Sequence, residues 1–80
     1  MGYHIRPIQK GVLGTPSKIQ EELDELKDAI EQDVKILAIV ELSDIYGALE
    51  AVADSYGMTM QDLAKMHQCT KRAFLSGDRT

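Results

Sequence analysis

Two pairs of acidic residues have the spacing of metal ligands. Glu22 and Glu25 lie three residues apart, and so do Glu41 and Asp44. Side chains three positions apart on an α-helix share a face, so each pair would present its carboxylates together. Hard oxygen ligands, with no cysteine or histidine in either motif, suit Mg²⁺ or Mn²⁺, and water and phosphate oxygens would complete the shell. The four residues are therefore candidate ligands of a metal site that also binds phosphate.

The first pair lies in a strongly acidic segment. From residue 21 to residue 33 the chain has seven carboxylates and a single base. Like charges at helical spacing cost roughly 0.2–0.5 kcal/mol per pair, so either the whole face is solvated or a cation lies against part of it. We interpret Glu22 and Glu25 as the cation-binding part. The other acids of the helix are expected to face water: Asp24, Asp28 and Glu31.

The chain is expected to begin with an irregular arm over residues 1–16, where glycine and proline recur. Residues 17–80 are expected to form one helical domain. Thr15 or Ser17 would cap its first helix, over about residues 17–31. An apolar stripe with helical period should turn this helix toward the core: Ile19, Leu23, Leu26 and Ile30.

Two further helices are expected at residues 34–55 and 60–76. Asp33 and Thr59 would cap them, and Gly57 would end the middle helix in the left-handed conformation. Because the loops are short, the first two helices should form an antiparallel hairpin. Fifteen residues separate the two acidic pairs, which is enough for both pairs to converge across one groove of that hairpin.

The segment 34–55 is apolar nearly all round, and a helix of that kind is normally buried. One hairpin partner and one further helix cannot cover it on every side. We therefore expect an all-α fold, an antiparallel helical hairpin plus a third helix, that completes a four-helix-type bundle by homo-oligomerisation as a homodimer or homotetramer. Glu41 and Asp44 would lie inside or at the wall of a cleft, where carboxylates are costly unless they are paired or bind a metal.

Composition disfavours several classes of protein. The 80 residues suffice for one domain, and the net charge of -4 argues against binding to nucleic acid or to an anionic membrane. The single cysteine, Cys69, permits no internal disulfide and indicates a reducing, cytoplasmic setting. No signal peptide is evident, and no apolar run reaches about 18 residues, so no membrane span is expected.

The acids follow the pattern EExxE (residues 21–25), fifteen residues, then ExxD (residues 41–44). This pattern resembles the signature of the MazG-like all-α nucleotide pyrophosphohydrolases. The stretches SKIQEELDEL and VELSD, and the tail KMHQCTKRAFLSGDR, are also similar to small members of that family. The resemblance covers about residues 11–79. It implies a helical oligomer that uses Mg²⁺ to cleave a nucleoside triphosphate into monophosphate and pyrophosphate, with these metal ligands: Glu22, Glu25, Glu41 and Asp44.

Such a reaction needs an oriented water and bases that hold the phosphates. Glu21 or Glu22 is the candidate to orient or deprotonate the water. Lys18, one turn before Glu22, could reach the same groove. Three bases of the last expected helix could hold the phosphates: Lys65, Lys71 and Arg72. Many members of the family have Asn four residues after the lysine of that helix, where this chain has Cys69.

Two other functions stay open. Phosphoribosyl-ATP pyrophosphohydrolases share the metal motif, so the motif does not distinguish them from enzymes that cleave nucleoside triphosphates. A non-catalytic acidic helical module that binds a basic partner is the alternative outside the enzymes, and it would need acids spread over an exposed surface. Neither histidine is expected to be a ligand, because His4 lies in a loop with no partner motif and His67 lies on the apolar stripe of the last helix.

Overall fold

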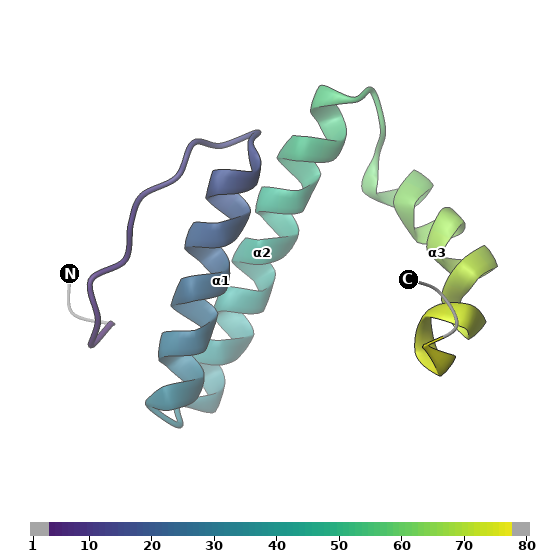
Figure 1. The fold of residues 1–80 in the computed structure, drawn as a ribbon. Helices are drawn as coiled ribbons and strands as arrows, with labels where there is room; N and C mark the ends of the chain where they lie inside the picture. The colour runs from purple at the N-terminus through teal and green to yellow at the C-terminus, as the bar shows by residue number, and fades with distance from the viewer. Residues whose placement is uncertain (1–3, 78–80) are drawn as a thin grey trace.

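The structure is a computed structural model that describes residues 4–77 and consists of an N-terminal arm followed by three α-helices (Figure 1). The helices are α1 (Pro16–Glu31), α2 (Lys35–Ser55) and α3 (Met60–Ser76). Their bounds agree with the expected ones to within one residue. No strand is present in the described part of the chain, and the expected all-α class is confirmed.

The turn between α1 and α2 is short because α1 ends in a Schellman motif. Asp33 has a φ of 59°, in the left-handed region. Its N–H donates to the carbonyl of Ile30 (2.9 Å), and the N–H of Val34 donates to the carbonyl of Ala29 (3.3 Å). Asp33 therefore terminates α1. The expectation that Asp33 caps α2 is wrong, because Val34 occupies that N-cap position.

The loop between α2 and α3 contains the two residues that the sequence predicted for it, Gly57 and Thr59. Gly57, with a φ of 75°, lies just past the end of α2. The hydroxyl of Thr59 accepts the N–H of Asp62 (3.1 Å), and the carboxylate of Asp62 accepts the N–H of Thr59 (2.9 Å). This reciprocal pair is a capping box, which satisfies two backbone donors at the start of α3.

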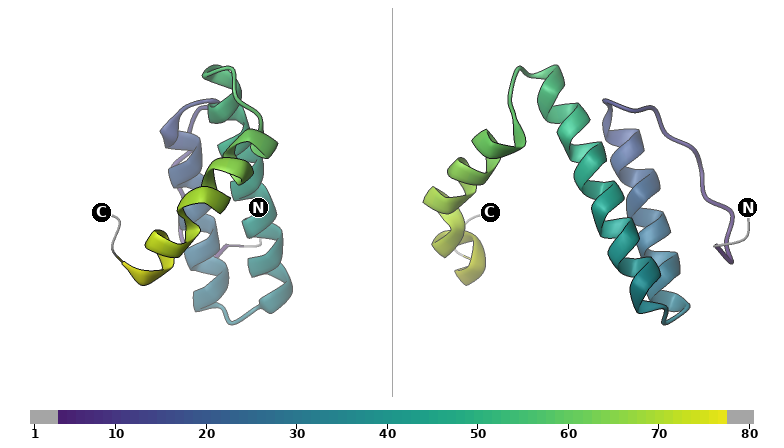
Figure 2. Two further views of the ribbon diagram at one scale, coloured as in Figure 1. Left: turned by 90° about the vertical axis from the view of Figure 1, so that its right-hand side faces the viewer. Right: turned by 180° about the vertical axis from the view of Figure 1, so that it is seen from behind.

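The first two helices pack antiparallel against each other, and α3 projects away from them (Figures 1 and 2). The arm runs along α1, on the side away from α3 (Figure 1). Within one chain α3 contacts the hairpin little, so it leaves most of α2 uncovered.

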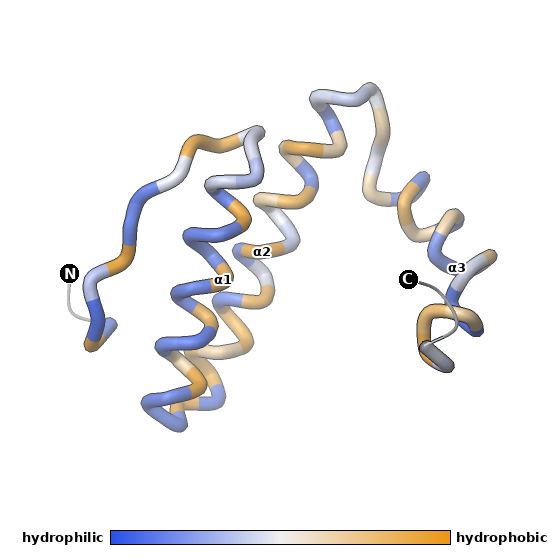
Figure 3. The backbone as a smooth tube through the Cα atoms, viewed as in Figure 1, coloured by the Kyte–Doolittle hydropathy of each residue, from blue (hydrophilic) through white to orange (hydrophobic). Residues whose placement is uncertain are grey.

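Much apolar surface is exposed in a single chain. Figure 3 shows hydrophobic residues, in orange, recurring along α2 and α3. The outer face of α2, defined here by four side chains at helical spacing, is between 39% and 55% exposed: Ile39, Leu42, Tyr46 and Leu49. The buried hydrophobic residues among those described are three alanines: Ala29, Ala48 and Ala53. The sequence predicted burial of α2 only within an oligomer, so its exposure in one chain leaves that expectation a prediction. The α1 stripe is turned inward only in part, because Ile30 is 62% exposed.

None of the helices in the described residues is long and apolar enough to cross a membrane.

Candidate metal centre

The four predicted ligands meet across the groove between α1 and α2. One carboxylate oxygen from each residue lies within 4.8 Å of the others in this acidic group: Glu22, Glu25, Glu41 and Asp44. Glu22 and Glu41 are buried, Glu25 is half-buried, and Asp44 is exposed. The predicted convergence of these side chains is thus present in the structure, and the binding of an ion by them stays a prediction.

Two oxygens of the acidic group lack a hydrogen-bond partner within the described residues. They are Oε1 of Glu22 and Oε1 of Glu41, both fully shielded from solvent. A buried carboxylate oxygen without a partner is costly, and folded proteins rarely leave one. A divalent cation between the helices would satisfy both, so the donor set fits such an ion.

Burial and charge repulsion act on this group together. Burial, together with the neighbouring carboxylates of Glu25 and Asp44, raises the pKa of Glu41 to about 7. Burial also raises the pKa of Glu22, although Lys18 opposes this. Raised carboxyl pKa values are typical of functional sites, where the fold concentrates charges that it does not neutralise itself.

An open groove of about 680 Å³ adjoins the acidic group, which is within the size range of small-ligand sites. One side carries the acids Glu25, Glu41 and Asp44. The rest of the wall comes mainly from the start of α2 and the turn before it: Gln32, Val34, Ile36, Leu37 and Val40. With a cation bound to these acids, the groove could admit a ligand with an anionic part and an apolar part.

His4 also reaches the acidic group, and the sequence did not predict this. Its Nε2 lies 3.2 Å from Oε1 of Glu25 and 3.6 Å from Oε2 of Glu41, and its Nδ1 lies 3.3 Å from Oδ1 of Asp28. His4 lies outside the helices, as expected, but the absence of a partner motif in the sequence did not mean the absence of partners. Its partners are at least 21 residues away in the sequence, so no local motif connects them.

Asp28 is buried and anchors the arm, contrary to the expectation that it faces water. Its carboxylate accepts the N–H of Arg6 (2.9 Å), the N–H of Ile5 (3.1 Å) and the side-chain amide of Gln32. Burial alone would raise the pKa of Asp28, but these hydrogen bonds outweigh it and lower the pKa. The expectation failed because the arm covers this face of α1.

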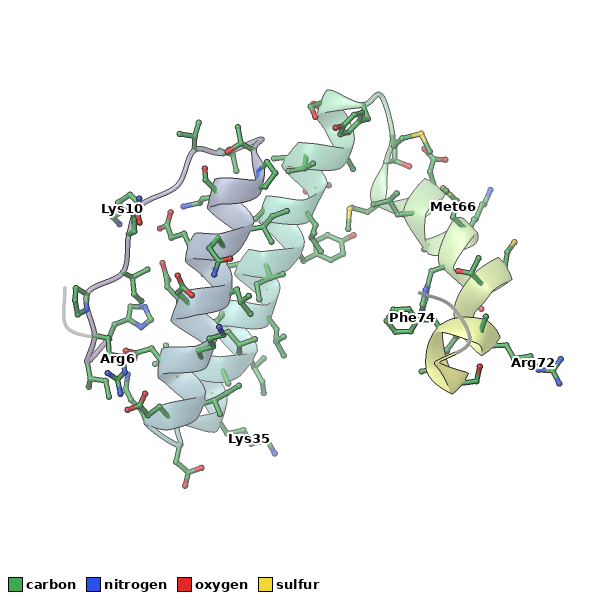
Figure 4. The ribbon with its side chains drawn as sticks, in the orientation of Figure 1. Arg6, Lys10, Lys35, Met66, Arg72 and Phe74 are labelled. Carbon is green, nitrogen blue, oxygen red and sulfur yellow. The ribbon has the colours of Figure 1, made fainter. Side chains whose placement is uncertain are left out.

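The other two acids expected to face water also have partners. Glu31 pairs with the guanidinium of Arg6, whose Nε lies 2.8 Å from its Oε1. This pair lies at the C-terminal end of α1, where Figure 4 labels Arg6. Asp24 accepts a hydrogen bond from Gln20 at 2.9 Å and stays near the surface.

Glu21, a predicted catalytic residue, binds the arm and is not one of the four acids whose oxygens converge. The N–H of Gly11 (2.8 Å) and Nζ of Lys18 (3.1 Å) bind its Oε1, and they lower its pKa. Gly11 is needed for this close approach, since a Cβ there would lie 2.2 Å from the carbonyl oxygen of Ser17. Glu22, which does lie in the acidic group, remains the candidate to orient a water.

The predicted substrate-binding bases fall into two sets. Nζ of Lys18 lies 3.2 Å from Oε2 of Glu22, so Lys18 borders the acidic group as expected. The other three are on α3, which lies apart from the hairpin, and Figure 4 shows Arg72 directed outward. A single chain does not bring these three to the carboxylates: Lys65, Lys71 and Arg72.

Comparison with models of protein families, with curated proteins and with solved structures found no match. A function for the chain is therefore argued from its own side chains. Four converging carboxylates, two of them with unpaired buried oxygens, can bind a divalent cation. The adjoining groove, and Lys18 beside Glu22, can hold an anionic ligand next to that ion.

Proposed function

We propose that the chain is a metal-dependent nucleoside triphosphate pyrophosphohydrolase, which releases pyrophosphate and a nucleoside monophosphate. The observation that carries the proposal is the acidic group with its two unpaired buried oxygens. The resemblance of the acidic pattern to that of MazG-like enzymes supports this substrate class. An acidic interaction module fits less well, because Glu22 and Glu41 are buried and cannot reach a protein partner.

The acidic group would hold Mg²⁺ or Mn²⁺. The bound cation would neutralise phosphate charge and lower the pKa of an attacking water. Glu22 has an unpaired oxygen in the group and a raised pKa, which suits it to orient that water and accept its proton. Lys18 lies beside Glu22 and is placed to bind a phosphate at the edge of the group.

The proposal includes a homo-oligomer, with two hairpins forming a four-helix-type bundle. Three buried alanines are a small core for a chain of this length, whereas a second copy would cover the outer face of α2. In such an assembly α3 of one copy could lie at the groove of the other. That is how the three bases of α3 would take part in phosphate binding: Lys65, Lys71 and Arg72.

The test is pyrophosphate release from a panel of ribo- and deoxyribonucleoside triphosphates and phosphoribosyl-ATP, with Mg²⁺, Mn²⁺ or EDTA. We expect metal-dependent release by the wild-type chain. Glu41→Gln should reduce it by at least about 100-fold, because a metal ion contributes several kcal/mol to such a step. Glu50→Gln is the matched control, since Glu50 is an exposed acid on the same helix outside the acidic group, and it should keep the activity.

Two results would contradict the proposal. One is the absence of release from every compound of the panel by a folded wild-type protein at saturating metal. The other is equal loss of activity in Glu41→Gln and Glu50→Gln, since this would show that the acidic group has no special part in the reaction. Release from phosphoribosyl-ATP alone would keep the site and its chemistry and replace the proposed substrate.

A further inference from the structure

The arm places the imidazole of His4 beside the acidic group, for which the sequence motif predicted only oxygen ligands. We infer that His4 is itself a ligand of the cation, through Nε2, together with Glu25 and Glu41. The inference rests on the metal site of the proposed function, but it concerns the identity of the ion and not the reaction. It gives the N-terminal arm a role that the acidic motif does not contain.

The separations between the atoms suit a shared ion. Nε2 of His4 lies 3.2 Å from Oε1 of Glu25 and 3.6 Å from Oε2 of Glu41. Adjacent ligands of an octahedral ion with bonds of about 2.1 Å are about 3.0 Å apart. One ligand atom from each of the three residues lies within 4.8 Å of the others. Small side-chain movements would therefore place all three atoms around one ion.

The second ring nitrogen has the partner that a metal-binding histidine needs. Nδ1 of His4 lies 3.3 Å from Oδ1 of Asp28. Histidine ligands commonly donate this other N–H to a carboxylate, which fixes the ring and leaves the free nitrogen for the metal. Asp28 is well placed for the task, because the backbone N–H groups of Ile5 and Arg6 hold it against the arm. One carboxylate thus positions both the arm and the ring.

The acidic group also offers an unsatisfied atom that points to a ligand. Among residues 4–77, Oε1 of Glu41 has no hydrogen-bond partner, although the residue is only 3% exposed. With the hydrogen of His4 on Nδ1, the lone pair of Nε2 would face Glu25 and Glu41, and a cation between them would stabilise all three. Imidazole nitrogen favours transition metals, and carboxylates accept Mn²⁺ as readily as Mg²⁺. The chemistry therefore points to Mn²⁺ over Mg²⁺.

The experiment is electron spin-echo spectroscopy of Mn²⁺ bound to the full chain, with Mn²⁺ affinity measured by titration. Wild-type protein should show nitrogen coupling to the ion. His4→Gln should lose that coupling and bind Mn²⁺ at least about tenfold more weakly, since even indirect partners of a metal contribute that much. The same substitution should weaken the affinity for Mg²⁺ by a smaller factor.

The second histidine provides the matched control. His67 lies on α3 and packs edge-on against Phe74, with ring centroids 5.4 Å apart. His67→Gln should keep both the coupling and the affinity. Labelling the histidines of the wild-type chain with ¹⁵N should change the coupling frequency, which gives the same readout without a substitution that could release the arm.

The outcomes separate this inference from the proposed function. Mn²⁺ that binds to wild type but not to Glu41→Gln, without nitrogen coupling, would overturn the inference and leave the carboxylate site intact. His4 would then only hold the arm against α1. Absence of any Mn²⁺ binding would overturn the inference, and together with the absence of Mg²⁺-dependent pyrophosphate release it would overturn the proposed function as well. Nitrogen coupling that persists in His4→Gln would assign the ligand elsewhere and reject His4.

Discussion

At the scale of single residues, the acidic group is a local excess of negative charge that the chain leaves partly unneutralised. Glu41 is buried among other carboxylates, and its pKa rises to about 7. Glu21 and Asp28 are buried as deeply, yet hydrogen bonds lower their pKa values: from Gly11 of the arm to Glu21, and from Gln32 and the arm to Asp28. The difference lies in the donors: backbone N–H groups reach Glu21 and Asp28, whereas Oε1 of Glu41 has none among the described residues.

This contrast predicts how the stability of the metal-free protein depends on pH. The folded pKa of Glu41, about 7, lies above its usual 4.5. Its stabilising contribution should therefore be complete below about pH 4.5 and be lost as the pH rises through 7, by at most about 3 kcal/mol. The measurement is urea unfolding in EDTA between pH 4.5 and 8.

Glu41→Gln serves as the control for this prediction. It should flatten most of the decline and be the more stable protein at pH 8, because it removes a buried charge. Glu22, whose pKa is also raised, should leave a smaller decline of the same sign. A wild-type slope that persists in full in Glu41→Gln would show that other groups cause it.

At the scale of elements, the arm behaves as part of the site because α1 holds it at several points. Its N–H groups at Ile5 and Arg6 bind Asp28, and the N–H of Gly11 binds Glu21. The N–H of Val12 donates to the hydroxyl of Ser17 at 2.9 Å, near the start of α1. An irregular segment is thus fixed mainly through its backbone, and the side chain of His4 is delivered to the groove.

Asp28→Asn should loosen the first part of the arm, because an amide carries one acceptor oxygen where the carboxylate has two. Amide hydrogen exchange at residues 5 and 6 should become faster, with helix α1 unchanged. Asp24→Asn is the matched control, since Asp24 lies on the same helix and, within the described part of the chain, accepts a hydrogen bond only from Gln20. Equal exchange rates in the two variants would show that Asp28 does not hold the arm.

At the scale of the whole molecule, a single chain leaves apolar side chains uncovered. The outer face of α2 is 39–55% exposed along its length, and no residue of α3 is buried in the described structure. Apolar surface of this extent is typical of protein–protein interfaces. A second copy is the occupant that the proposed bundle requires, and it would bury the outer face of α2.

Leu42→Glu should dissociate the proposed oligomer, because it places a charge at the centre of the outer face of α2. Light scattering after gel filtration would measure the mass, which should fall to that of one chain. Lys27→Gln changes the net charge by the same single unit at an exposed site on α1, and it should leave the mass unchanged. A wild-type chain that is already a monomer at assay concentrations would contradict the oligomer.

The sequence by itself determined the three helices and the meeting of the two acidic pairs. Both depend on local signals: hydrophobic period, capping residues, and a fifteen-residue spacing that a tight turn converts into proximity. Which of the other α1 acids bind the arm and which stay near the surface was not predictable in this way. Asp24, Asp28 and Glu31 are the same type of residue at similar spacing, and only the path of the arm distinguishes them.

Only the tertiary structure decided that path. Asp28 binds backbone N–H groups 22 and 23 residues away, and every residue except proline carries such a group, so no residue type marks the contact. The contact between the backbone N–H of Gly11 and Glu21 likewise has no residue type that marks it in the sequence. His4 enters the acidic group as a consequence of these backbone contacts. The sequence determined which carboxylates could bind a metal, and the fold decided which nitrogen lies beside them.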